Sequence, residues 1–450
     1  MDYLKITLRA KYILLFLGVF LLSFQREAKA QSLYFPPNVG NQWDTISPGS
    51  LGWCQNRIDS LYQFLDSNNT KAFLLLKDGK IVLENYFGGF AQNDPWYWAS
   101  AGKTVTSFMT GIAQQEGFLS INDTTSQYLG TGWTSCTQQQ EEKITIWHQL
   151  TMTSGLDDGV PDHYCTLDTC LVYKADAGTR WAYHNGPYTL LDQVISTATG
   201  NTLNNYTSQK LLGPIGMSGA FLPNGYNNVF YSNARSMARF GLLILNRGVW
   251  NGNVVMSDTN YFNQMVNTSQ QLNKSYGYLW WLNGKPSFML PTLQNVFQGS
   301  LNPNAPADMI AALGKNGQVL NVVPSQNLVW LRMGDSQGTG DVSVFLNNQI
   351  WDKINQLPCP TSITEPQINN HGITCVFNSF TGDVSIKSEQ SLKRLEAYDP
   401  SGKLIMTVSP GRNYHDFKLP EPYSGFVILR ATSTNGFQAV FKGVVFENAE

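Results

Sequence analysis

Residues 98–117 read WASAGKTVTSFMTGIAQQEG and combine a helix with a reactive pair of side chains. Apolar residues recur at helical spacing from Lys103 to Glu116, and Gly117 follows as a stop signal. Ser100 and Lys103 are three positions apart, which places both side chains on one helix face. A serine hydroxyl attacks a carbonyl poorly until a neighbouring group accepts its proton. The segment therefore predicts a nucleophile, Ser100, with Lys103 as its proton-transfer partner.

Two further motifs follow this pair along the chain. They are Tyr183-His184-Asn185 and Lys315-Asn316-Gly317-Gln318. Alone, S-x-x-K recurs by chance, and it also fits a helix-capping serine followed by an exposed lysine. The later motifs have structural alternatives too: Tyr183 as a core aromatic, Asn185 as a helix cap and Lys315 as a turn residue. The order of the three motifs favours the catalytic interpretation.

Three longer stretches accompany the motifs: residues 144–156 (ITIWHQLTMTSGL), 236–252 (SMARFGLLILNRGVWNG) and 276–281 (YGYLWW). With them, residues 60–356 resemble the serine β-lactamase and penicillin-binding-protein superfamily, in which S-x-x-K and K-T-G are signature motifs. The resemblance is to class C-like members, particularly the esterase and aminohexanoate-oligomer-hydrolase branch. It implies an α+β fold, with an antiparallel sheet, helices on both sides of it and a helical subdomain.

The resemblance also implies which residues are catalytic. Ser100 would attack the substrate carbonyl, and Lys103 would take its proton. Tyr183, alone or as a relay with Lys103, would pass a proton to the leaving group, and Lys315 would keep the local field positive. His184 lies between two motif residues, and we expect it to face away from the substrate.

A second group of residues is implied to bind the substrate. Asn185 would hydrogen-bond Lys103 or a substrate amide, and Asn316 and Gly317 would line the site. The backbone N–H groups of Ser100 and Gln318 would form the oxyanion hole, because donors aimed at a developing negative charge stabilise it.

Two features of the sequence depart from the β-lactamase pattern. Members that recognise β-lactams have a threonine, whose hydroxyl helps to hold the drug's carboxylate, where this chain has Asn316. Residues 96–98 (WYW) crowd the approach to Ser100 with aromatic rings. Both features argue against a dedicated β-lactamase and favour an apolar or linear ester or amide as substrate.

The rest of the N-terminal part mixes strands with helices. Residues 72–87 read as a hairpin whose turn is Asp78-Gly79. Helices are expected over residues 188–199, 234–246 and 342–356, and strands over 318–323 and 328–333. The mixture indicates an α+β or α/β fold for a hydrolase domain that spans residues 31–357.

Residues 358–450 are expected to form a separate domain. Short strand-like runs separated by turn residues predict a small β-sandwich there; they are residues 384–386, 392–398, 404–408, 425–431 and 438–445. The stretch LEAYDPSGKLIMTV (395–408) resembles the sorting domain of the type IX secretion route. The resemblance implies outer-membrane secretion machinery as a partner. A carbohydrate- or protein-binding sandwich remains the alternative.

Residues 1–30 have the features of a secretory signal peptide. A basic start precedes an apolar run over residues 13–24, and Ala28-Lys29-Ala30 provides a cleavage site. About a dozen apolar residues are too few to span a bilayer, which argues against a membrane anchor. We expect cleavage after Ala30 and a protein secreted to the periplasm, the cell surface or the medium.

The charge composition excludes some classes of partner. The formal net charge is −2, and only 14% of residues are charged. Nucleic-acid and anionic-membrane partners both require a basic patch, for which the composition gives no support. We expect a small-molecule or peptide substrate and no cofactor.

Six cysteines fall in the exported part, and an even number in an oxidising compartment favours disulfides. Their separations favour the pairs Cys165–Cys170 and Cys359–Cys375, which leaves Cys54 with Cys136. The alternative is a metal site; it would use His163, Cys165, Cys170 and His184, but it lacks a second closely spaced pair of ligands.

The sequence thus predicts a secreted serine hydrolase that cleaves an ester or amide through an acyl-enzyme on Ser100. One alternative is a D-peptidase or penicillin-binding enzyme acting on cell-wall peptides. Another is a catalytically silent surface-binding protein of the same fold.

Overall fold

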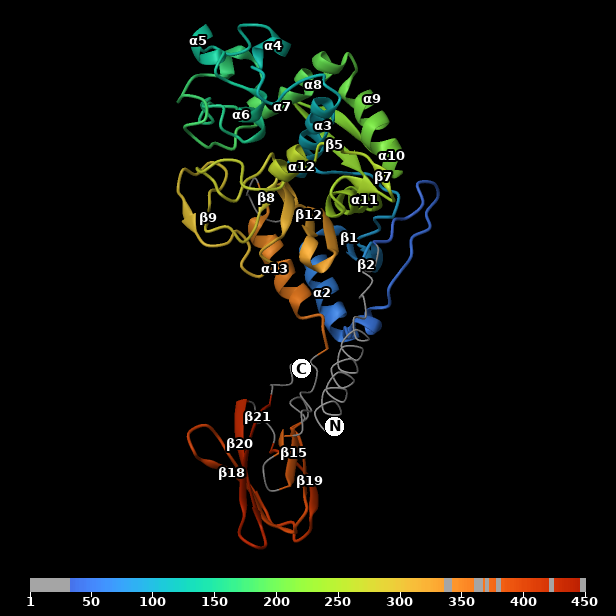
Figure 1. The fold of residues 1–450 in the computed structure, drawn as a ribbon, viewed down its shortest axis with the longest axis vertical. Coiled ribbons are helices and arrows are strands. Elements are labelled where there is room, and N and C mark those ends of the chain that lie inside the picture. The colour runs from blue at the N-terminus through green and yellow to red at the C-terminus, as the bar shows by residue number, and fades with distance from the viewer. Residues whose placement is uncertain are drawn as a thin grey trace, which may run out of the picture. The chain divides into compact units, whose positions relative to one another are not determined.

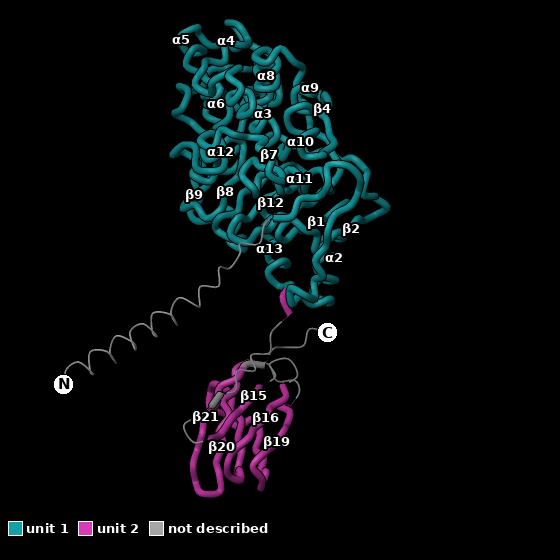
Figure 2. Tube along the Cα trace, turned by 45° about the vertical axis from the view of Figure 1, so that its right-hand side comes forward, with its two compact units in different colours: residues 1–357 teal, residues 358–450 magenta. Residues whose placement is uncertain are grey.

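The computed structural model describes residues 33–335, 342–359, 367–368, 372–377, 382–420 and 425–445 (Figure 1). The predicted signal peptide lies outside these residues. The chain divides into two compact units, residues 1–357 and 358–450 (Figure 2). Among the described residues, no helix is long and apolar enough to cross a membrane.

The first unit is built on a six-stranded antiparallel sheet in the order β2-β1-β13-β12-β11-β8. The strands are β1 (Thr70–Lys77), β2 (Lys80–Tyr86), β8 (Trp281–Leu282), β11 (Ile310–Gly314), β12 (Gln318–Val323) and β13 (Leu328–Gly334). The predicted hairpin is β1–β2, and both residues of its turn have positive φ: 52° at Asp78 and 83° at Gly79. Such turns match the natural twist of a hairpin.

Helices cover both faces of this sheet. Trp330 on β13 meets Trp351 of α13 (Val344–Asn355), with ring centroids 5.7 Å apart. Its neighbour Val329 lies against Gly241 of α11 (Ala234–Leu245), where an added Cβ would be 2.6 Å from Val329. Successive strand residues point to opposite faces, so α13 and α11 lie on opposite sides of the sheet. Helix α2 (Gln55–Ser67) packs with α13 and β1.

A helical part and a smaller sheet complete the first unit. Its helices are α3 (Lys103–Gln115), α4 (Ser126–Leu129), α5 (Gln138–Glu141), α6 (Ile146–Leu150), α7 (Asn185–Thr189), α8 (Leu191–Thr199), α9 (Leu203–Thr207), α10 (Gly213–Ile215) and α12 (Thr259–Met265). The smaller sheet has the order β3-β5-β4, formed by β3 (Trp96–Tyr97), β5 (Asn227–Ser232) and β4 (Ala220–Asn224). Short pairs join β6 (Val249–Trp250) to β7 (Asn253–Val254), and β9 (Ser287–Phe288) to β10 (Phe297–Gln298). The helix predicted over residues 188–199 is divided between α7 and α8, whereas those over 234–246 and 342–356 form α11 and α13.

The second unit consists of two four-stranded sheets. One has the order β14-β15-β16-β19, from β14 (Gln367–Ile368), β15 (Ile373–Phe377), β16 (Asp383–Ser388) and β19 (Tyr414–Lys418). The other has the order β18-β17-β20-β21, from β18 (Leu404–Val408), β17 (Leu392–Tyr398), β20 (Gly425–Ser433) and β21 (Gln438–Val445). Ile386 of the first sheet and Leu429 of the second share one apolar core. The predicted runs all form strands, but the sequence reading missed β14, β15 and β19.

The structure contains one of the three predicted disulfide pairs and contradicts the other two. Cys165 and Cys170 form a disulfide, as predicted. Cys136 and Cys375 are free thiols, so the predicted pairs Cys54–Cys136 and Cys359–Cys375 are wrong. Cys54 and Cys359 are each disulfide-bonded. The prediction relied on separation along the chain, whereas the fold brings the Cys54 N–H within 3.1 Å of the Leu357 carbonyl oxygen.

Candidate active site

Ser100 lies in a single 3-10 turn, η2 (Ala99–Gly102), that leads directly into α3. The residue before it, Ala99, has φ 47°, a left-handed conformation that costs a non-glycine residue energy and is frequent at functional sites. Gly314, at the end of β11, approaches so closely that an added Cβ would lie 3.1 Å from the Ser100 nitrogen. The sheet edge and the strained turn thus fix the Ser100 backbone.

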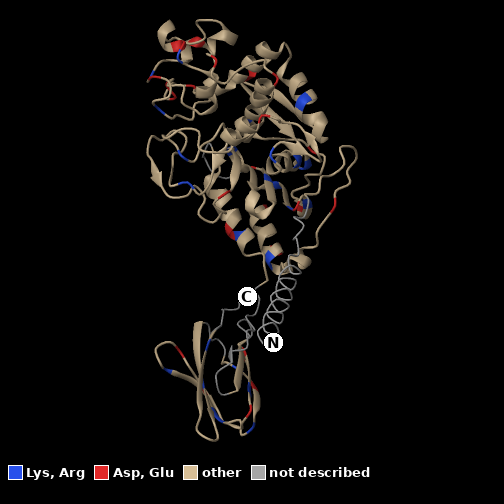
Figure 3. Cartoon of the chain, in the orientation of Figure 1, with Lys and Arg blue, Asp and Glu red and all other residues tan. Residues whose placement is uncertain are grey.

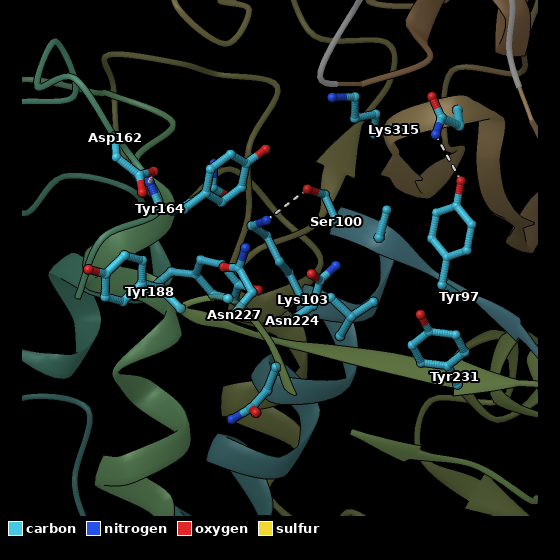
Figure 4. Close-up of a pocket in the computed structure, with 17 residues that line it drawn as sticks. Tyr97, Ser100, Lys103, Asp162, Tyr164, Tyr188, Asn224, Asn227, Tyr231 and Lys315 are labelled. Carbon is cyan, nitrogen blue, oxygen red and sulfur yellow. Dashed lines mark hydrogen bonds between the residues drawn. The ribbon is translucent and has the colours of Figure 1, made fainter. Parts of the chain in front are cut away.

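Lys103 opens α3 and points back at Ser100. Its Nζ donates a hydrogen bond of 2.8 Å to Ser100 Oγ (Figure 4). The side chain is buried, with 3% of Lys103 exposed, and Nζ lies 4.1 Å from the Tyr188 ring centroid and 5.0 Å from that of Tyr183. Aromatic faces favour the charged form of a lysine, whereas burial disfavours it. The two effects together set how readily Lys103 accepts a proton.

The second motif lies on the Lys103 side of the site. Asn185 begins α7, is 2% exposed and lines the cleft, and its Oδ1 has no hydrogen-bond partner among the described residues. Tyr183 is buried, and its ring stacks on Trp281 at 5.9 Å. Tyr183 does not line the cleft, whereas Tyr188, which sequence reasoning missed, does.

His184, the middle residue of the second motif, is buried and is not among the cleft residues. Neither ring nitrogen has a hydrogen-bond partner among the described residues. Burial lowers the pKa of His184 to about 4, with the charge of Asp158 opposing this effect. The ring is therefore neutral at physiological pH.

The third motif forms the turn η5 (Lys315–Gly317) between β11 and β12. Lys315 is exposed and lines the cleft. Asn316 has a left-handed backbone, φ 61°, and its Nδ2 donates to the Tyr97 hydroxyl at 2.8 Å. That hydroxyl in turn donates to Asp335 Oδ1 at 3.2 Å. The side-chain amide of Asn316 is thus engaged by Tyr97.

Gly317 and Gln318 do not line the cleft. The Gly317 N–H donates to Ser343 Oγ at 2.7 Å. The Gln318 side chain is buried and pairs with the backbone of Gly334, accepting from its N–H at 3.1 Å and donating to its carbonyl oxygen. The Gln318 side chain thus holds the neighbouring strand, which leaves its backbone N–H for the predicted oxyanion hole.

A buried arginine, not found by sequence reasoning, supports the third motif from below. Arg332 on β13 is fully buried and donates to the carbonyl oxygens of Asn316, at 3.1 Å, and Gly317, at 2.7 Å. It also donates to Thr70 Oγ1 at 2.9 Å, and burial lowers its pKa to about 10. A Cβ on Gly317 would lie 2.0 Å from Arg332 Nη1, so only glycine fits there.

The cleft in front of Ser100 has a volume of about 550 Å³. Its far wall is the β4–β5 hairpin, with Asn224, Asn227 and Tyr231 visible around the site in Figure 4. Amides and tyrosines dominate the lining, and its charged residues are Lys103, Lys315 and Asp162. This sparseness agrees with the chain as a whole, on whose described residues charges of both signs are few and interspersed (Figure 3).

The metal alternative does not fit the structure. Cys165 and Cys170, two of its four ligands, are joined in a disulfide and cannot bind a metal as thiolates. The described residues contain no group of three or more His, Cys, Asp or Glu side chains arranged to hold a metal ion.

The fold and the site together define a class of protein. It is a mixed α/β protein with a serine–lysine pair at the start of a buried helix. The family model for β-lactamase matches residues 69–352, more than half of the chain. The chain therefore belongs to the β-lactamase family, whose members are generally serine hydrolases.

Solved structures show the same fold. A protein of Bacillus anthracis assigned as a 6-aminohexanoate-dimer hydrolase aligns with a TM-score of 0.53 at 21% identity, covering 73% of this chain and 91% of that one. One of Bacteroides dorei assigned as a β-lactamase gives 0.54 at 17%, covering 68% and 99%. A family VIII carboxylesterase gives 0.52 at 13%, covering 71% and 100%. No curated protein matches the chain.

Proposed function

We propose that this protein is a serine hydrolase that cleaves an uncharged ester or amide through an acyl-enzyme on Ser100. The observation that carries the proposal is the 2.8 Å hydrogen bond between Lys103 Nζ and Ser100 Oγ in a desolvated setting. As Oγ bonds to the substrate carbonyl carbon, its proton passes to Lys103. Lys103, in relay with Tyr183, then returns a proton to the leaving group as the carbonyl–leaving-group bond breaks. Water releases the acyl group in a second step.

The strand side of the cleft supports an uncharged substrate. A terminal carboxylate, such as that of a β-lactam or a D-peptide, would need several donors beside the nucleophile. Here one Nδ2 hydrogen of Asn316 is donated to Tyr97, and Lys315, the cation that lines the cleft on this side, is exposed to water. The names of two structural neighbours, a 6-aminohexanoate-dimer hydrolase and a carboxylesterase, agree with a linear amide or an ester.

We also propose that the protein acts outside the cytoplasm. The features of residues 1–30 support export with cleavage after Ala30. The Cys165–Cys170 disulfide supports an oxidising compartment. The strand-rich unit 358–450 would then serve as a sorting domain for outer-membrane secretion machinery. Mass spectrometry of the exported protein tests the proposed signal peptide. A mature chain that begins at Met1 would contradict cleavage after Ala30.

The function is tested with a fluorophosphonate probe, which acylating serine residues capture covalently. We expect labelling of the wild type and its loss in Ser100→Ala. Ser107→Ala is the matched control, because Ser107 lies on the same helix and its buried Oγ has no hydrogen-bond partner among the described residues. It should label like the wild type.

The outcomes separate the rival functions. Labelling that survives Ser100→Ala would refute Ser100 as the nucleophile. Failure of every acylating probe to label the wild type would favour the silent binding protein. Labelling by penicillin, together with release of D-alanine from a D-Ala-D-Ala peptide, would favour the D-peptidase. Intact-mass detection of the adduct across an ester, a D-dipeptide and a β-lactam identifies the acyl group.

A further inference from the structure

A buried carboxylate lies behind the catalytic pair. Asp192 is on α8, is 6% exposed and was not singled out by any sequence motif. Its Oδ1 accepts a hydrogen bond from Thr106 Oγ1 at 3.3 Å, and its Oδ2 accepts one from Asn228 Nδ2 at 3.1 Å. Among the described residues, no lysine or arginine forms an ion pair with it. Burying an ionised carboxylate with only two neutral donors costs free energy, so its place behind the catalytic pair needs an explanation.

Both hydrogen-bond partners of Asp192 lie on elements that carry residues of the site. Thr106 is on α3, one helical turn beyond Lys103, and Asn228 is on β5 and lines the cleft. The two hydrogen bonds therefore join the helix that carries the lysine to the hairpin that faces the substrate. One of the two Nδ2 hydrogens of Asn228 is donated to Asp192, which fixes the orientation of the amide and leaves its second hydrogen and its Oδ1 for the cleft.

The electrostatic surroundings connect Asp192 to the same lysine. Among the described residues, the titratable groups that interact electrostatically with Asp192 are Lys103 from α3 and Tyr188 from α7, while β5 contributes the neutral Asn228. The Tyr188 ring also lies against the Lys103 ammonium. An ionised carboxylate at this place favours the protonated form of Lys103, which is the form that cannot take the proton of Ser100.

We propose that Asp192 is a positioning residue that sets both the proton affinity of Lys103 and the orientation of the Asn228 amide in the cleft wall. The inference rests on the proposed function of Ser100 and Lys103. Burial, opposed by the hydrogen bonds from Asn228 and Thr106 and by the charge of Lys103, raises the pKa of Asp192 to about 7. The carboxylate therefore gains its charge near neutral pH.

The test is the pH dependence of the rate at which the fluorophosphonate labels Ser100, in three forms of the full chain. In Asp192→Asn the negative charge is gone, so Lys103 releases its proton at lower pH. The rising limb of the profile should move to lower pH by about 1 unit. Thr106→Val removes one hydrogen bond to the carboxylate but keeps the carboxyl group, so its limb should move less than that of Asp192→Asn.

Asp192→Asn should fold. A group whose folded-state pKa is raised stabilises the protein at low pH and loses that contribution as pH rises through the folded value, here about 7. At pH 8 the variant should therefore be at least as stable as the wild type. If it does not fold, Asp192→Ser removes the same charge and is measured instead.

The outcomes distinguish this inference from the function on which it rests. Coincident profiles of the wild type and Asp192→Asn, with both proteins labelled at Ser100, would overturn the role of Asp192 alone. An equal shift in Thr106→Val would show that packing and not charge is responsible, and would overturn it too. Absence of Ser100-dependent labelling in the wild type would overturn the proposed function, and the inference with it.

Discussion

The charged side chains on the two sides of Ser100 differ in their exposure to solvent. On the helical side, both charged groups are buried: Lys103 of α3 lies against the Tyr188 ring of α7, and Asp192 of α8 accepts from the Asn228 amide of β5. On the strand side, Lys315 is exposed, and the buried cation, Arg332, lies beneath the turn and does not line the cleft. The charged groups beside the proposed proton transfer are therefore buried, whereas the lysine beside the expected substrate position is exposed to water.

This difference separates two tasks that a hydrolase must combine. Burial magnifies the field of each charge, so small displacements on the helical side change proton affinities strongly. Water screens an exposed lysine, so Lys315 orients a substrate without perturbing the nucleophile much. On the strand side, the hydrogen bonds that Arg332 donates to the turn hold the backbone of the third motif in place.

The sharpest test of the difference compares the two lysines of the cleft. Lys103→Met removes the proton acceptor, and we expect the rate of Ser100 labelling to fall about 10³-fold. Lys315→Met removes a screened charge, and a loss of at most about 10-fold is expected. Both variants should keep the wild-type melting temperature within a few degrees. Equal losses in the two variants would show that the sides do not divide the work in this way.

The second test addresses the support beneath the strand side. Arg332→Met removes a donor from the carbonyl oxygens of Asn316 and Gly317, of which the Asn316 oxygen keeps only a longer bond from Gln318, and unsatisfied buried acceptors cost free energy. We expect the free energy of unfolding in urea to fall by about 3 kcal/mol. Arg247→Met is the control, since Arg247 is exposed, and it should cost less than about 0.5 kcal/mol. A similar small loss in both variants would refute the support role of Arg332.

The sequence predicted those parts of the site that are local in the chain. Ser100 and Lys103 meet because they are one helical turn apart, and the β1–β2 hairpin forms because its turn residues demand it. Arg332 and Asp192 were missed because their contacts are distant. Thr70 and Arg332 are 262 positions apart, Thr106 and Asp192 are 86, and neither pair belongs to a motif.

Two of the predicted disulfide pairs were wrong for a related reason. Separation along the chain found Cys165–Cys170, but it could not foresee that Cys136 and Cys375 stay reduced. Tyr188 was overlooked because it was read as the first residue of a helix, although its spacing from Asn185 places it on the cleft side of α7.

The third test uses acid to probe the burial of the helical side. The pKa of His184 is lowered to about 4, so the unfolded chain takes up a proton first as pH falls. Stability from this residue is present above pH 6.5 and is lost as pH falls from 6.5 towards 4. We expect the wild type to lose about 2 kcal/mol more than His184→Asn over this interval. Parallel curves from urea unfolding at each pH would show that the ring is hydrated.

The smallest expected effect isolates the backbone of the strand side. Asn316 has φ 61°, where a β-branched residue is strained and glycine is not. Asn316→Thr and Asn316→Gly both lose the hydrogen bond to Tyr97, so the difference between them reports the strain alone. We expect the threonine variant to be less stable by about 1 kcal/mol. If it is as stable as the glycine variant and gains penicillin labelling, the turn has rearranged. The strand side would then be as adaptable as the helical side is fixed, and the preference for uncharged substrates would rest on one residue.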